Sequence, residues 1–190
     1  MPSRDSSLIG RVARQLTQAP AYAEAAGARG SLLSVAACSF GWRADNDELT
    51  QPTGFDPEAA RLFEAVVEGA FLVANADGEF DDTEQAAFQH VVVSACAGRV
   101  AESQVSALLA DLHDQLGEDG MQKRIEMVAQ AISRDDHARE VLRVSSLLAY
   151  VSGGVSLVER EVLDKLAAEF KLTDAAVEQA IEEAAHALIE

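Results

Sequence analysis

The distribution of proline constrains the fold of this chain more than any other feature of its sequence. All four prolines lie before residue 58, at positions 2, 20, 52 and 57. The remaining residues, 58–190, are rich in alanine, glutamate, leucine and glutamine, which favour helices, and no proline interrupts them. No long alternation of apolar and polar residues indicates strands. We therefore expect an all-α fold.

Apolar residues recur at helical spacing in seven stretches of residues 56–190. The first helix is expected to begin at Asp56-Pro57-Glu58, which reads as an N-cap, a first-turn proline and a first-turn acid, and to end near Asn75. The next two are expected to end at Gly98 and Gly117. The other four are expected to begin near residues 121, 136, 156 and 173. Seven helices joined by short loops predict a helical bundle.

The first 55 residues have a different character. Residues 6–18 predict a short amphipathic helix, and the alanine-rich residues 21–42 predict one or two more. Residues 43–56 are polar and contain proline and glycine, which is typical of a linker. We therefore expect an N-terminal helical extension and linker at 1–55, followed by a helical domain at 56–190.

The charge of the chain is strongly negative, with a formal net charge of −17. Acidic and basic residues balance within residues 1–55, so the whole excess lies in residues 56–190. A nucleic acid needs clustered lysine and arginine, so it is excluded as an expected partner. A small oxyanion would meet a repulsive field. Divalent cations and basic protein surfaces are the partners that this charge favours.

The two cysteines, Cys38 and Cys96, cannot form a disulfide framework, and no C-x-x-C motif is present. They are typical of reduced cytosolic thiols. The sequence has no apolar stretch of about 18 residues and no secretory signal pattern, so we expect a cytoplasmic protein.

An internal echo is the most informative pattern. Residues 71–88 align without gaps with residues 146–163, at an offset of 75 positions. In each copy an apolar helix leads into a glycine loop, and a cap residue precedes a glutamate by three positions. The chain therefore looks like two pseudo-repeated halves, each a helix–loop–helix unit.

The first of these loops is crowded with oxygen-bearing side chains. Their number and spacing suit hard cations such as calcium, which take six to eight oxygen ligands. With Gly78 at the invariant glycine, the spacing overlaps part of an EF-hand loop, although Val73 stands where that loop normally has its first aspartate. The candidate ligands of this loop are Asn75, Asp77, Asp81 and Glu84.

A second interpretation needs no cation. Asp81-x-x-Glu84 and Ser156-x-x-Glu159 are both capping boxes, in which the cap oxygen accepts a backbone N–H and the glutamate reaches back. Capping does not require Asp77, however. At neutral pH the loop carboxylates repel one another, and a bound cation would relieve that repulsion. Both interpretations stay open on the sequence alone.

Residues 56–190 resemble the TerB family of tellurite-resistance proteins. The segment ANADGEFDDTE (74–84), its degenerate echo and the segment 111–132 carry the resemblance. It implies an all-helical fold of two similar halves with acidic loops that bind metal. The implied metal ligands are Asp77, Asp81, Glu84 and Glu159, with calcium as the expected ion and zinc or magnesium as alternatives. Ser152 stands where the second loop of the family often has aspartate.

The resemblance also implies a setting. TerB-like proteins work in cytoplasmic stress complexes with a TerC-like membrane protein and TerD-like proteins, which would place this chain at the inner membrane face through a partner. A homodimer is a further expected association. We therefore expect a non-enzymatic, acidic, divalent-cation-binding interaction module in tellurite and chemical-stress resistance. The alternative is a metal-independent helical scaffold whose acidic loops are only helix caps.

Overall fold

The computed structural model describes residues 5–20, 22, 30–40 and 56–189 of the chain. Within these ranges the chain forms helices and no strand, which confirms the all-α prediction. The predicted linker at 43–56 lies outside the described residues except for Asp56. The helices are α1 (Asp5–Thr17), α3 (Leu32–Phe40), α4 (Pro57–Ala74), α5 (Asp82–Ala95), α6 (Glu102–Asp119), α7 (Met121–Ala131), α8 (Asp135–Ala149), α9 (Leu157–Glu169) and α10 (Asp174–Ile189).

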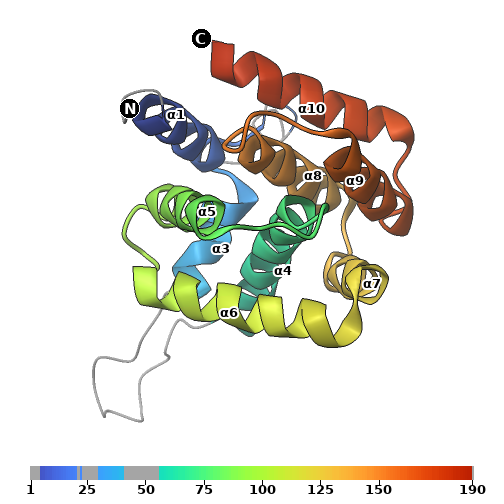
Figure 1. Ribbon diagram of the computed structural model, residues 1–190, viewed down its shortest axis with the longest axis horizontal. Coiled ribbons are helices and arrows are strands. Elements are labelled where there is room, and N and C mark those ends of the chain that lie inside the picture. Colours follow the sequence, from blue (N-terminus) through green and yellow to red (C-terminus); the bar gives the residue numbers. More distant parts are fainter. Residues whose placement is uncertain (1–4, 21, 23–29, 41–55, 190) are drawn as a thin grey trace.

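Helix α4 is the centre of the bundle. It packs against α3, α7, α8 and α9, and Figure 1 shows it enclosed by the other helices. Its apolar residues surround most of the helix rather than one stripe, which is typical of a fully buried helix. Phe63, Phe71 and Leu72 are among the largest fully buried side chains of the described residues.

The two halves predicted from the sequence echo are present as α4–loop–α5 and α8–loop–α9. Helix α4 ends at Ala74 and α8 at Ala149, while α5 begins at Asp82 and α9 at Leu157, so both pairs of ends keep the offset of 75. The first helices of the two units, α4 and α8, pack directly against each other. They are in close contact at Gly69, where a Cβ atom would lie 2.6 Å from Cγ1 of Val141.

The N-terminal helices contribute to the same hydrophobic core as residues 56–190. Helix α1 packs mainly against α5, and α3 packs along α4. Leu16 of α1 and Leu33 of α3 are both fully buried. The side chain of Arg143 on α8 donates to the carbonyl of Gln15 at 2.9 Å, near the end of α1. The boundary at residue 55 stays a prediction, but helices on both sides of it share one core.

The ends of the helices follow the cap residues. Asp56 accepts hydrogen bonds from the amides of Glu58 and Ala59, as its N-cap pattern predicts. The prediction that the third helix of residues 56–190 ends at Gly117 was wrong, because α6 runs on to Asp119. It ends where Gly120 adopts φ +78°, the left-handed backbone that glycine accepts without strain. Gly117 takes ordinary helical geometry inside α6.

Of the helices in the described part of the chain, none combines the length and the apolar character needed to cross a bilayer.

Candidate site between the two loops

The two loops share a backbone frame. In the first loop (75–81), Gly78 adopts φ +80° and its N–H donates to the carbonyl of Asn75 at 3.1 Å. In the second loop (150–156), Gly153 adopts φ +125° and its N–H donates to the carbonyl of Tyr150 at 3.4 Å. Both glycines hold positive φ values that other residues rarely adopt. The aligned glycines of the echo therefore mark the same turn.

The first loop is fixed to the core by an aromatic side chain. The ring of Phe80 makes edge-to-face contacts with Phe71 of α4 at 5.7 Å and with Phe88 of α5 at 5.8 Å between centroids. Such pairs are typical of well-packed aromatic clusters. Phe80 thereby holds the loop against both helices that it connects, which sets the direction of the carboxylates on either side of it.

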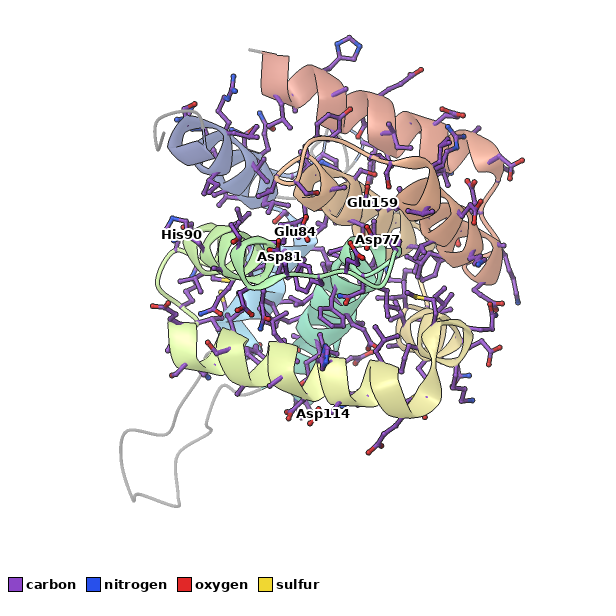
Figure 2. All side chains as sticks on the ribbon, viewed as in Figure 1. Asp77, Asp81, Glu84, His90, Asp114 and Glu159 are labelled. Carbon is purple, nitrogen blue, oxygen red and sulfur yellow. The ribbon has the colours of Figure 1, made fainter. Side chains whose placement is uncertain are left out.

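A cavity of about 580 Å³ lies between the two loops. The first unit contributes part of the first loop and the start of α5, and the second unit contributes the second loop and the start of α9. Helix α1 closes a further side through Leu8 and Ile9. In Figure 2 the labelled carboxylates gather where the two loops meet, whereas Asp114 lies on the outer face of α6.

The two aspartates of the first loop have different positions. Asp77 is exposed, lines the cavity and accepts a hydrogen bond from the amide of Glu79 at 2.9 Å. Asp81 is the N-cap of α5, and its Oδ1 accepts from the amides of Thr83 and Glu84, each at 2.8 Å. Asp77 therefore faces the shared cavity, while Asp81 binds the first turn of its own helix.

The two glutamates complete the predicted capping boxes. Glu84 Oε2 accepts from the amide of Asp81 at 3.4 Å, and Glu159 Oε2 accepts from the amide of Ser156 at 2.7 Å. Glu159 is only 9% exposed and Glu84 is half-buried. Both line the cavity between the loops. Capping thus accounts for one oxygen of each glutamate and leaves both carboxylates at the cavity wall.

The structure therefore brings together three of the four predicted ligands, Asp77, Glu84 and Glu159, on one cavity, and Asp81 is not among the lining residues. Asn75 points its amide nitrogen at the carbonyl of Phe71, 2.9 Å away, and so caps the end of α4. Within the described ranges, no three histidine, cysteine, aspartate or glutamate side chains converge closely enough to hold a metal ion.

The apolar part of the cavity is the feature that sequence reasoning missed. Leu8, Ile9, Phe80, Phe88, Leu148 and Val151 all line it. His90 of α5 also faces the cavity and is exposed. Leu8 and Ile9 lie on the predicted apolar face of the first helix, but their spacing alone gives no sign of which partner they meet. Only the packing of α1 against α5 places them beside the loops.

The first helix of each unit also holds a buried carboxylate paired with an arginine, away from the cavity between the loops. Glu68 of α4 accepts from Arg124 of α7 at 2.7 Å. Glu140 and Arg143, both of α8, pair at 3.2 Å. Burial raises the pKa of both Glu68 and Glu140, and the neighbouring arginine opposes that rise in each case. The Glu68–Arg124 pair joins α4 to α7, and Arg143 joins α8 to the end of α1 through the carbonyl of Gln15.

Comparisons with protein-family models, with curated proteins and with solved structures found no match to this chain.

Proposed function

We propose that this chain is a non-enzymatic, acidic interaction module that binds a positively charged group in the cavity between its two loops. One observation carries the proposal: Asp77, Glu84 and Glu159 come from both units and line the same cavity. Carboxylates that share a partly enclosed space repel one another in an environment of reduced dielectric constant. A cation between them removes that repulsion and links the two units.

A divalent cation is the simplest occupant. Calcium suits an all-oxygen ligand set best, and magnesium or zinc are alternatives. Since the cap amide uses Oε2 of each glutamate, the ion would be bound through Oε1, so that capping and ion binding are compatible. In this mechanism an ion held by the carboxylates would offset most of their charge, and the two units held together by it would present their surface to a partner.

The setting follows from the resemblance to the TerB family. We propose a role in tellurite and chemical-stress resistance, with TerC-like and TerD-like proteins as partners and with any membrane association made through such a partner. The acidic surface supports a protein partner over an oxyanion, because tellurite would be repelled by a net charge of −17. Burial also raises the pKa of the Cys96 thiol to about 12, which leaves it protonated and a poor nucleophile at neutral pH.

Calorimetric titration of the full chain with calcium, magnesium, zinc and manganese tests the ion-binding mechanism. The decisive variant is Glu84→Gln with Glu159→Gln, since glutamine keeps the capping box and removes only the charge. Its matched control is Asp114→Asn with Glu161→Gln, which removes two exposed charges that do not line the cavity. We expect ion binding that the cavity variant abolishes and the control retains.

The metal-independent scaffold is the second candidate, and the hydrogen bonds favour it. Asp81, Glu84 and Glu159 each accept a backbone amide at a helix start, which is a complete structural role. If none of the four ions gives heat or changes the melting temperature, the divalent-cation mechanism fails and the scaffold remains.

A further inference from the structure

The lining of the cavity is larger and more apolar than an ion needs. Its volume of about 580 Å³ falls within the range of sites that hold small molecules or side chains, roughly 300–1,000 Å³. An ion would contact the carboxylates and leave the apolar walls of α1, α5 and α8 without a ligand. Leu8, Ile9 and Leu148 therefore indicate an occupant with an apolar part of its own.

The charge of the cavity lining indicates which charge the occupant carries. Of the described residues that line the cavity, three are carboxylates, and His90 is the basic one. A positively charged group is complementary to such a wall, and a negatively charged one is repelled. A second copy of this chain also carries a net charge of −17, so charge repulsion disfavours it as the occupant.

Two exposed apolar side chains lie at the start of α9, outside the cavity lining. Leu157 is 83% exposed and Val158 is 41% exposed. They stand between Ser156 and Glu159, both of which line the cavity. The equivalent residues of the first unit are Asp82 and Thr83, so the apolar surface is confined to the second unit. A partner protein that extends beyond the cavity onto the start of α9 would cover these side chains, which an enclosed small molecule would leave in water.

We propose that the cavity binds an amphipathic segment of a partner protein, with a large apolar side chain beside a lysine or arginine. The apolar side chain packs against Leu8, Ile9 and Phe88, and the cationic group lies at Glu84 and Glu159. This is the arrangement of an interface with a buried apolar anchor and a charged rim. The inference rests on the proposed function in using the same cavity, but it requires no metal.

Fluorescence anisotropy with three labelled synthetic peptides tests this inference on the full chain in buffer containing EDTA. The first is an amphipathic leucine–lysine helix, the second replaces each lysine by glutamate, and the third scrambles the first so that its apolar face is lost. We expect only the first to bind tightly. Equal binding of the scrambled peptide would overturn the inference, because charge alone would then explain the association.

Variants locate the binding. Glu84→Gln with Glu159→Gln should weaken the lysine peptide by about tenfold, as loss of a charge-assisted contact does. The control Asp114→Asn with Glu161→Gln should change affinity less than about twofold, as exposed charges do. Ala87→Trp, which fills the cavity without altering its charge, should also abolish binding. Equal losses in the cavity variant and the surface control would contradict the proposed location.

A competition experiment separates this inference from the ion-binding mechanism. Calcium and the peptide use the same carboxylates. Bound calcium should therefore lower the affinity for the peptide, and bound peptide should lower the affinity for calcium by the same factor. Calcium binding without peptide binding would overturn the inference and leave the ion site. Peptide binding in EDTA, with no effect of any ion, would support the inference and exclude the ion-binding mechanism. Amide shift perturbations by NMR at Leu8, Ile9 and Leu148 verify the site without depending on any variant.

Discussion

The first loop and the second loop reach the same backbone frame with different side chains. Both turn at a glycine of positive φ, and both lead into a capping box. The first loop is held by the Phe71–Phe80–Phe88 cluster and exposes the carboxylate of Asp77. The second loop is held by hydrogen bonds to the end of α8, because the hydroxyl of Ser152 and the amide of Gly154 both donate to the carbonyl of Ala149.

This difference shows that the backbone geometry of the loops and their side-chain chemistry depend on different residues. The glycine and the cap box determine where the chain turns, and they are present in both units. The positions inside the capping box are free to differ, and they hold Asp82 and Thr83 in the first unit but Leu157 and Val158 in the second. The same separation appears in the core, where Glu68 of the first unit occupies the position of Arg143 in the second. At this one position the two units thus carry buried side chains of opposite charge.

The largest expected effect comes from removing one member of a buried ion pair. Arg143→Met leaves the carboxylate of Glu140, which is 3% exposed, with two donors at 3.4 Å, the hydroxyl of Tyr22 and the amide of Leu32, and should lower the free energy of unfolding by about 3–5 kcal/mol. Arg124→Met strands Glu68 of α4 and also releases Asp119, which Arg124 holds at 3.0 Å, so we expect a loss at least as large. Urea unfolding at pH 7 measures both losses.

The pH dependence of these variants gives the control. Burial raises the pKa of Glu140, and removal of Arg143 takes away the charge that opposes this rise. The stranded carboxyl then binds a proton more readily in the folded chain than in the unfolded one, so the loss should shrink as the pH falls toward 5. A loss that is the same at pH 5 and pH 8 would contradict the assignment to a buried charge.

The next largest effect on stability is expected at the contact between α4 and α8. Gly69→Ala places a methyl group 2.6 Å from Cγ1 of Val141, so either the side chain of Val141 must rotate or α4 and α8 must move apart, at a cost of about 1–3 kcal/mol. Gly117→Ala is the matched control, because its Cβ would meet no atom within 4 Å and the residue is helical. This control should raise stability by about 0.5–1 kcal/mol. Thermal or urea unfolding distinguishes the two signs.

The N-caps of α5 and α9 allow a direct comparison of the two loops. Asp81 accepts two amides at 2.8 Å, whereas the hydroxyl of Ser156 accepts one at 3.3 Å. Asp81→Ala should therefore lower the free energy of unfolding by about 1–2 kcal/mol, and Ser156→Ala by about 0.5–1 kcal/mol. Urea unfolding of the two single variants checks the order. An equal cost for both would show that the number of accepted amides does not set the strength of the cap.

The smallest expected effect is a pH dependence that belongs to the second unit. Burial lowers the pKa of His137 below its usual value, and the equivalent residue of the first unit is Leu62. The folded chain therefore binds a proton at His137 less readily than the unfolded chain does, so this contribution to stability is lost as the pH falls below about 6.5. His137→Gln should flatten the stability profile between pH 7.5 and pH 5.5. Identical profiles for the variant and the parent would refute this assignment.

The sequence was sufficient for features determined by neighbours along the chain. The N-cap at Asp56 and the capping boxes at Asp81 and Ser156 are confirmed, because each depends on contacts within four residues. The end of α6 was predicted at Gly117, since composition does not show which glycine, 117 or 120, adopts positive φ. Local spacing determines the N-cap of a helix, but packing between helices determines which glycine ends it.

The candidate site was only half predictable for the same reason. The spacing of the first loop and the echo identified Asp77, Glu84 and Glu159, which do line one cavity. It gave no reason to exclude Asp81, whose side chain turns toward its own helix. Nor could it place Leu8 at the site, because that residue is separated from the loops by more than sixty positions. Contacts between distant segments require the assembled bundle.

The wall that α1 contributes has a consequence for how such a protein diversifies. Leu8 and Ile9 belong to neither repeat, so substitutions there leave the turns, the caps and the ion pairs of both units intact. Under the proposed function, chains with identical repeats would select different partners through substitutions at these two positions alone. The rest of α1 is constrained, because Val12 and Leu16 are fully buried and the carbonyl of Gln15 accepts from Arg143.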